Sequence, residues 1–348
     1  MTNKTKFAIV GAGVISANHA RAISGNPEAE LVAVCDIIPE KATKLASEYG
    51  VTKTYENYEE MFEKETIDIV SVCVPSGLHA EVTIAAANAG INVLCEKPLD
   101  ITREKMTNMT EPCRTANVKL GAVYQRRTLD AAIKTRQAIQ EGKFGKLVLG
   151  DAYLKYYRSP EYYKSAGWRG TWELDGGGAL MNQGVHGVDL IQWMVGEVES
   201  VFAYAAPLVR DIEVEDTAVI TVKYKNGAFG VIQGTTSVYP GQETRFEIHG
   251  ENGSVIFADS GFKQWKFEGS DEPMPEAGNE EGGSSDPRSI SQEGHFIFVD
   301  DMIKAVREDR EPLVPGEEAR KAVDLLLAIY ESARTGKEVK VNEFSKTL

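Results

Sequence analysis

Residues 6–16 read KFAIVGAGVIS, an apolar run that leads directly into two closely spaced glycines. The run at 7–10 is short and has no polar residue, which is typical of a strand buried on both faces of a parallel sheet. Gly11 and Gly13 match the first two glycines of the pattern GxGxxG, and Ser16 takes the place of the third. Such a turn lets the backbone approach a pyrophosphate at the N-terminus of the following helix. The stretch therefore predicts the start of a dinucleotide-binding βαβ unit.

The alternation of strand and helix continues through the N-terminal third of the chain. Further Val- and Ile-rich runs follow the first at 29–36, 67–75, 91–98 and 119–125. Segments with helical periodicity lie between them, at 16–24, 39–49, 58–63, 80–89 and 103–117. This alternation indicates an α/β fold with a doubly wound parallel sheet. We therefore expect residues 1–124 to form a Rossmann domain.

The pattern changes after Tyr124. A predicted helix at 129–141 leads into longer runs of alternating residues, and KNGAF at 225–229 and GENGSV at 250–255 are hairpin signals. These features predict a C-terminal α/β domain, residues 125–348, with an open, mainly antiparallel sheet and a helix at 181–195 packed on it. The acidic, Gly- and Pro-rich segment at 268–288 is expected to be a solvated loop, with a lid as the alternative.

The composition narrows the classes of function. The net charge is −14 and no basic stripe is present, which argues against nucleic-acid binding. No apolar run approaches the roughly 18 residues of a membrane span, and the N-terminus has no signal-peptide pattern. The four cysteines have no CxxC spacing, so we expect reduced, buried thiols in a cytoplasmic protein and no metal site. An open sheet suits self-association, and we expect a homodimer or homotetramer.

Asp36 follows the second predicted strand, about 20 residues after Gly13. An acidic residue there binds the adenosine ribose hydroxyls, although an Asp at a strand end also caps the next turn. No Arg or Lys follows directly, and a carboxylate would repel a 2′-phosphate, so we expect NAD rather than NADP. His79, after the third strand, either packs near the cofactor or starts the next helix. The other residues expected near the cofactor in these turns are Val14, Ile15, Pro75 and Leu78.

CEKPLD, at 95–100, places Glu96 and Lys97 at the carboxyl end of the fourth strand. Ligands bind at this end of an open α/β sheet. A Lys in such a crevice can have a lowered pKa and exchange a proton, whereas the alternative is an exposed Lys on a loop.

GGGALMNQGVHGVDL, at 176–190, is open to two interpretations. It either feeds an ordinary buried helix or brings Asn182 and His186 to a ligand. On a helix, Asn182, His186, Asp189 and Trp193 would share one face. Asp189 is then either part of a site or only an anchor for the helix.

The motifs GAGVIS, CVPSGLH, CEKPL and GGGALMNQGVHGVDL occur in this order along nearly the whole chain. In this arrangement the chain resembles the glucose–fructose oxidoreductase / inositol dehydrogenase / MocA family. The resemblance implies an N-terminal Rossmann domain and a C-terminal α/β domain with an open sheet. It also implies nicotinamide-dependent oxidation or reduction of sugars, sugar derivatives or cyclitols.

The resemblance implies roles for single residues as well. Lys97 and His186 would flank the reacting carbinol. The residues implied at the cofactor are Glu96 at the ribose on the nicotinamide side, Gln125 near the nicotinamide, and Trp168 and Arg169 from the second domain.

Asn182 departs from the inositol dehydrogenases, which carry Asp four residues before the His. The chain thus looks more like the branch that oxidises sugar nucleotides or glycosides at C3. Asn cannot accept a proton, which excludes a carboxylate–histidine relay through this position, but it can orient a hydroxyl.

Oxidation of a secondary alcohol requires loss of one proton and transfer of one hydride, so the protein must orient the carbinol and manage the proton. We expect His186 to be the base and Lys97 to polarise the oxygen, with the reverse assignment as the alternative. Arg126 and Tyr156 belong to basic and aromatic stretches at 124–127 and 153–172. We expect them to line the sugar pocket, with a mixed sheet surface as the alternative.

Other functions fit the same motifs. A glycoside-cleaving enzyme would oxidise C3 transiently and use NAD that stays bound, and an inositol 2-dehydrogenase would act on a cyclitol. An NAD-sensing protein would bind without turnover, but it would have no need for both Lys97 and His186.

Overall fold

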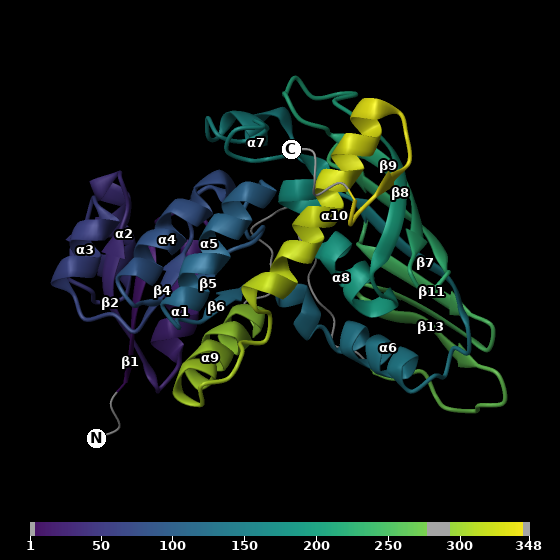
Figure 1. Cartoon of the computed structure of the whole chain (residues 1–348), viewed down its shortest axis with the longest axis horizontal. Coiled ribbons are helices and arrows are strands. Elements are labelled where there is room, and N and C mark those ends of the chain that lie inside the picture. The colour runs from purple at the N-terminus through teal and green to yellow at the C-terminus, as the bar shows by residue number, and fades with distance from the viewer. Residues whose placement is uncertain (1–3, 277–292, 344–348) are drawn as a thin grey trace. The chain divides into compact units, whose positions relative to one another are not determined.

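The computed structural model describes residues 4–276 and 293–343 (Figure 1). The chain divides into two compact units. The first unit consists of residues 1–125 and 292–320, and the second of residues 126–291 and 321–348. The segment 292–320 therefore packs with the N-terminal unit, whereas the sequence pattern assigned it to the C-terminal domain.

The first unit contains a six-stranded sheet in which every neighbouring pair is parallel. The strands lie in the order β3-β2-β1-β4-β5-β6, so the chain direction across the sheet switches between β1 and β4. The predicted doubly wound α/β fold is confirmed. The elements are β1 Thr5–Val10, α1 Ser16–Gly25, β2 Ala29–Cys35, α2 Pro39–Glu48, β3 Thr54–Tyr55, α3 Tyr58–Lys64, β4 Ile69–Val72, α4 His79–Asn88, β5 Asn92–Cys95, α5 Arg103–Thr115 and β6 Leu120–Ala122.

Helix α9 (Glu293–Arg307) joins the first unit because it packs along α1, as Figure 1 shows. The ring of Phe296 occupies the space beside Gly25, and Arg307 forms an ion pair with Glu28 at 2.7 Å. Beyond the helix, Val314 accepts a backbone hydrogen bond of 2.9 Å from Ala122 in β6. The segment thus covers the edge strand of the sheet, which would otherwise present unpaired backbone groups.

The second unit is built on an eight-stranded sheet in the order β13-β12-β11-β7-β10-β9-β8-β14. Among the described strand pairs of this second sheet, only β7–β10 is parallel, so the expected mainly antiparallel sheet is confirmed. The two predicted hairpins are β9–β10 and β11–β12. The strands are β7 Leu147–Lys155, β8 Val198–Ala206, β9 Thr217–Tyr224, β10 Phe229–Thr235, β11 Arg245–Gly250, β12 Gly253–Ala258, β13 Gly261–Phe267 and β14 Val339–Lys340.

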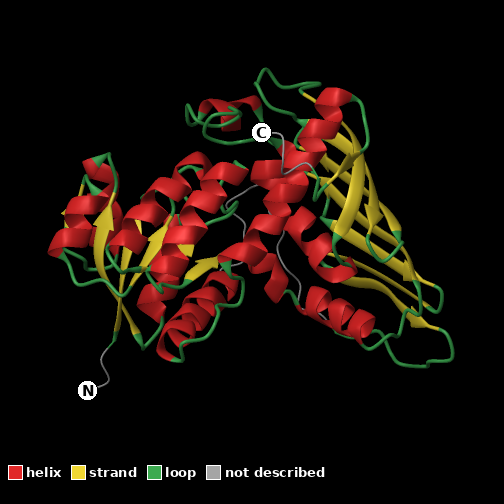
Figure 2. Ribbon diagram, viewed as in Figure 1, coloured by secondary structure: helices red, strands yellow, loops and turns green. Residues whose placement is uncertain are grey.

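Helices cover one face of this sheet (Figure 2). Helix α8 (Val185–Val195) packs on β7, with α6 (Asp130–Gln140) beside it. Small residues permit the close approach, because a Cβ at Gly187 would lie 2.3 Å from Leu154. The remaining helices of the described chain are the short α7 (Pro160–Lys164) and α10 (Gly316–Thr335), which passes from the first unit into the second at Arg320.

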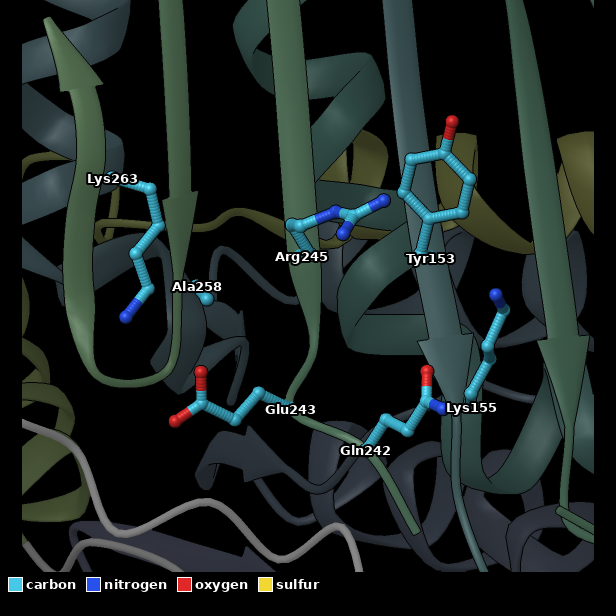
Figure 3. A pocket seen from close by; sticks show the side chains of 7 residues that line it. All are labelled: Tyr153, Lys155, Gln242, Glu243, Arg245, Ala258 and Lys263. Carbon is cyan, nitrogen blue, oxygen red and sulfur yellow. The ribbon is translucent and has the colours of Figure 1, made fainter.

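The other face of the sheet is open. It carries exposed Tyr204 and Phe229, and a polar hollow of about 430 Å³ lies on it (Figure 3). None of the predicted site residues lines the hollow, whose walls are Tyr153, Lys155, Gln242, Glu243, Arg245, Ala258 and Lys263.

The four cysteines are buried and free, as expected. Burial raises the pKa of the Cys35 and Cys113 thiols to about 12, which keeps them protonated. Within residues 4–276 and 293–343, no helix has both the length and the apolar character needed to cross a membrane. Most of the predicted acidic loop, from residue 277 onward, lies outside the described residues.

Candidate functional site

The glycine turn after β1 leaves room for a ligand. A Cβ at Gly11 would lie 2.6 Å from the backbone of Cys73, and its φ is +95°, so only glycine fits there. A Cβ at Gly13 would meet no atom of the described residues within 4 Å. The packing of the protein therefore does not require a glycine at position 13, whereas a pyrophosphate over the turn would.

Asp36 lies beside this turn. Its Oδ2 accepts a hydrogen bond of 2.7 Å from the backbone of Ala12, and its Oδ1 accepts one of 2.8 Å from Ile38. The Asp36 carboxylate thus caps the turn that follows β2, which was the alternative to a ribose-binding role. The same carboxylate also lies at the glycine loop. The side chain of the next residue, Ile37, is 84% exposed, and that of Val14 in the glycine turn is 68% exposed. Exposed apolar side chains beside an acidic residue fit an adenosine, so the residues present suit NAD.

His79 is the first residue of α4 and is buried. Its Nδ1 lies 2.8 Å from the carbonyl oxygen of Pro98, and its Nε2 lies 3.0 Å from that of Val74. The ring therefore ties the turn after β4, with half-buried Pro75 and Leu78, to the segment that carries Lys97. Contact of these three residues with the cofactor stays a prediction.

Glu96 is almost fully buried directly before Lys97, which is half-buried. Its Oε1 lies 2.9 Å from His19 Nε2 and 3.1 Å from His295 Nε2. Its Oε2 accepts a hydrogen bond of 3.1 Å from the backbone N–H of Lys97. Burial alone would raise the pKa of Glu96, but the two histidine hydrogen bonds hold it well below its usual range. A carboxylate is thus fixed next to Lys97.

The glycine run at 176–178 serves contacts within the second unit. A Cβ at Gly177 would lie 2.1 Å from the hydroxyl oxygen of Tyr330, and one at Gly178 would lie 2.0 Å from the carbonyl oxygen of Glu215. The glycines therefore permit a close approach of this backbone to Glu215 and Tyr330. The run leads into a π-helical turn, Ala179–Gly184, and then into α8.

Glu215 organises the start of that turn. Its carboxylate accepts backbone hydrogen bonds from Gly178 at 3.0 Å and Leu180 at 2.8 Å, and a third of 3.0 Å from the Tyr330 hydroxyl. Burial raises the pKa of Glu215 to about 7, against the lowering effect of these donors. The residue is therefore placed to hold the backbone that carries Asn182.

Polar side chains lie along the π turn and α8. The amide of Asn182 donates to Asp175, and its oxygen accepts from Gln183. His186 is 7% exposed, one turn further along. Asp189 accepts two hydrogen bonds from Arg127, at 2.6 and 2.7 Å, which makes it an anchor of α8. The π turn inserts one extra residue per turn, so Asn182 and His186 do not follow simple α-helical spacing.

The other predicted site residues lie in varied surroundings. Arg126 forms an ion pair with Asp259 at 2.9 Å, and the buried Tyr156 hydroxyl lies 3.3 Å from Thr244 Oγ1. Gln125 is buried at the end of the first unit. The Arg169 guanidinium lies over the rings of Tyr162, at 4.2 Å, and Trp168, at 4.6 Å. Their contacts with substrate or cofactor stay predictions.

Sequence reasoning missed four residues that the structure places in this machinery. They are His19 and His295 on Glu96, and Asp175 and Glu215 at the turn before α8. Helical spacing gives a weak indication that His19 is buried, because it falls between Ile15 and Ile23 on the apolar side of α1. His295 and Glu215 act across long sequence separations, which no local pattern reveals. Asp175 lies only seven residues before Asn182, but no motif in that stretch marks it.

A solved structure with the same architecture is the WlbA dehydrogenase from Bordetella pertussis, determined in complex with NADH and UDP-GlcNAcA. The two chains are 37% identical, with a TM-score of 0.87, and the match covers 97% of this chain and 99% of that one.

Among characterised relatives, myo-inositol 2-dehydrogenase of Thermotoga maritima is 28% identical over 97% of this chain and 99% of its own. D-Glucoside 3-dehydrogenase of Escherichia coli is 26% identical over 97% of both. Residues 5–124 match the oxidoreductase family with an NAD-binding Rossmann fold, and residues 133–256 match the GFO/IDH/MocA C-terminal domain. The chain has the glycine turn after β1, the Glu96–Pro98 segment and the helix that carries His186, and it belongs to the GFO/IDH/MocA family of NAD-binding oxidoreductases.

Proposed function

We propose that the protein oxidises the C3 hydroxyl of a nucleotide-linked pyranose with NAD, and that UDP-GlcNAcA is the first substrate to test. The observation that carries this proposal is Asn182, whose amide is held by Asp175. A carboxylate at position 182 would be the feature of an inositol dehydrogenase, and here the position holds a neutral hydrogen-bonding group instead. The 37% identity to the Bordetella pertussis dehydrogenase, which binds UDP-GlcNAcA, supports the choice of substrate.

In this proposal, Lys97 and His186 act on the same hydroxyl. The His186 imidazole accepts the hydroxyl proton, because an imidazole has a near-neutral pKa suited to a general base. The Lys97 ammonium donates a hydrogen bond to the same oxygen and so stabilises its developing negative charge. Asn182 orients a neighbouring hydroxyl. NAD held at the Gly11–Gly13 turn would supply the hydride acceptor.

The charge distribution of the second unit favours an anionic substrate. The protein has a net charge of −14, yet in the described part of the chain Arg169 lies on Tyr162 and Arg210 on Tyr157 rather than on a carboxylate. The Arg210 guanidinium lies 5.4 Å from the ring centroid of Tyr157, and its buried Nε has no hydrogen-bond partner among described atoms. Guanidinium groups held on aromatic rings suit carboxylates and phosphates.

The direct test incubates the protein with NAD and UDP-GlcNAcA, UDP-GlcNAc, methyl glucosides and myo-inositol, and follows NADH formation. We expect the highest kcat/KM with the charged sugar nucleotide, and a primary isotope effect when deuterium replaces hydrogen at C3. Faster turnover of myo-inositol would favour an inositol 2-dehydrogenase instead. Cleavage of a glucoside without NADH would indicate the glycoside-cleaving alternative.

Arg210→Met tests the anionic substrate separately. Loss of one charge-assisted contact should raise the KM for UDP-GlcNAcA about tenfold and leave the Kd for NADH unchanged. Lys164→Met is the matched control, because it removes one positive charge from an exposed position on α7. Equal effects of the two substitutions on KM would contradict a specific role for Arg210.

We also propose a homodimer or homotetramer formed through the open face of the second unit's sheet, in the cytoplasm. Exposed Tyr204 and Phe229 on that face, and Val219 at 44% exposure, support self-association. Four free, buried thiols fit a reducing compartment. Light scattering tests the assembly, and a monomeric mass would contradict it.

A further inference from the structure

We propose that His19 and His295 form a two-donor clamp on Glu96, and that this clamp sets the affinity of the first unit for NAD. The two histidines are positioning residues, since they act through Glu96. The inference rests on NAD binding by the family and not on the proposed substrate, so it stands or falls independently of the sugar.

The clamp is assembled from three separate parts of the first unit. His19 comes from α1, Glu96 follows β5, and His295 comes from α9 in the returning C-terminal segment. Their exposed fractions are 0%, 4% and 1%. The two rings meet edge to face, with centroids 5.2 Å apart, and both Nε2 atoms point at Glu96 Oε1.

The chemistry of the three groups fixes their protonation. A carboxylate oxygen can only accept, so each histidine carries its proton on Nε2 and donates it to Glu96. Burial lowers the pKa of His19 despite the nearby carboxylate, which favours the neutral ring. The triad therefore places a negative charge on Glu96, which accepts one N–H from each histidine. With the Lys97 backbone N–H on the other oxygen, three donors orient one carboxylate.

Two histidines and a glutamate could also bind a metal ion, and these ligand atoms lie within 4.8 Å of one another. Metal-bound histidines usually donate their second ring N–H to a partner that orients the ring. Neither His19 Nδ1 nor His295 Nδ1 has such a partner among the described atoms. Both Nε2 atoms also lie at ordinary hydrogen-bond distance from a single oxygen. The arrangement therefore fits a hydrogen-bonded clamp better than a metal site.

The clamp matters for NAD binding because it keeps Glu96 ionised and able to accept hydrogen bonds. An ionised carboxylate accepts hydrogen bonds from ribose hydroxyls, the role that the family resemblance implies for this residue. Without one histidine donor, the buried carboxylate becomes less stable, and its pKa rises. A protonated or rotated Glu96 accepts fewer hydrogen bonds, and the backbone of Lys97 loses its anchor.

The test compares His295→Leu, which removes the donor, with His295→Gln, whose amide can still donate to Glu96. NADH binding is measured by fluorescence without any sugar. We expect the Kd to rise about tenfold in H295L and to stay within about twofold of wild type in H295Q. His249→Leu is the control, because His249 lies on β11 in the second unit.

The pH dependence separates this role from simple loss of packing. In H295L, NADH binding should weaken as the pH falls toward about 6, because Glu96 now gains a proton in that range, whereas wild-type and H295Q affinities should stay level. The titratable or charged groups around Glu96 are His19, His295, Cys73, Cys95 and Lys97.

Equal Kd values for wild type and H295L would overturn the proposal, and so would a Kd raised equally in H295L and H295Q. One equivalent of tightly bound metal in the purified protein, measured by mass spectrometry, would also overturn it. If H295L fails to fold, His295→Asn replaces it, because its shorter amide does not reach the position of Nε2. The same tenfold loss is then expected for H295N.

Discussion

The Asp175 carboxylate explains why a neutral amide suits position 182. Asp175 is 2% exposed, and its carboxylate accepts hydrogen bonds from the Asn182 amide and from the backbone of Gly170, the latter at 2.8 Å. A carboxylate at position 182 would face another carboxylate in a buried setting. The departure from the inositol dehydrogenase pattern therefore has a local physical cause, because the acidic group here stands at position 175.

Asn182→Asp should destabilise the protein, because a half-buried carboxylate would repel the buried Asp175 and one hydrogen bond is lost. We expect thermal unfolding at about pH 8 to show a loss of roughly 2 kcal/mol, with partial recovery near pH 5, where one carboxyl is protonated and donates again. The double variant Asp175→Asn/Asn182→Asp restores an acid–amide pair and should recover the loss. A pH-independent loss that persists in the double variant would contradict this explanation.

Gly13→Val separates the needs of the ligand from those of the fold. Because no atom lies near a Cβ at this position, stability should change by less than about 1 kcal/mol. The added side chain would occupy the space predicted for the pyrophosphate, so the Kd for NADH should rise at least about tenfold. Gly11→Ala is the contrasting variant and should unfold at lower temperature. Unchanged NADH affinity in G13V would place the cofactor elsewhere.

The turn before α8 is the element that positions Asn182 and His186. Three consecutive glycines, a π-helical turn and α8 follow one another. Glu215, two residues before β9, and Tyr330 on α10 hold the glycine backbone. Gly177 and Gly178 are needed because Tyr330 and Glu215 occupy the space that a Cβ at either position would take. The backbone that carries Asn182 and His186 is thus positioned by groups distant in sequence.

Glu215 should make stability depend on pH. Its pKa is raised from 4.5 to about 7 in the folded protein, so its stabilising contribution is complete below about pH 4.5 and is lost as the pH rises through 7. The loss amounts to roughly 3 kcal/mol. Thermal unfolding between about pH 5 and pH 8 should show this decline in wild type and not in Glu215→Gln.

The matched control for that experiment is Glu213→Gln, which changes an exposed carboxylate two residues away. We expect E213Q to keep the wild-type pH dependence. Parallel curves for wild type and E215Q would show that Glu215 does not titrate in this range.

At the scale of the whole molecule, the C-terminal return to the first unit is the main departure from a simple order of domains. Residues 292–320 pack with the N-terminal sheet, supply His295 to Glu96, and cover the edge strand β6 through the contact of Val314 with Ala122. The NAD-binding unit is therefore built from two separate lengths of chain.

A fragment of residues 1–125 should consequently fold poorly, because β6 and the side of α1 that contacts α9 would be exposed. A fusion that links residues 1–125 to 293–320 through a flexible linker should unfold cooperatively and bind NADH. Calorimetry and NADH fluorescence check both proteins. Equal stability and affinity of the two would show that the returning segment is dispensable.

The sequence by itself determined the local parts of this protein. Apolar runs, glycine turns and hairpin signals act over a few residues, so the Rossmann unit, both hairpins and the positions of Gly11, Gly13, Lys97 and His186 on their elements could all be predicted. The helix bounds of the first unit up to residue 117 agree with the periodicity to within about two residues. The helix expected at 181–195 instead begins at Val185, because Ala179–Gly184 form a π-helical turn.

Only the tertiary structure decided which distant groups meet. The clamp on Glu96 joins residues separated by 77 and 199 positions, and Glu215 holds a backbone 37 positions away. The association of 292–320 with the first sheet depends on which surfaces α9 can bury. Such contacts are selected by packing and by the need of buried polar groups for partners, and these act between elements after they have formed.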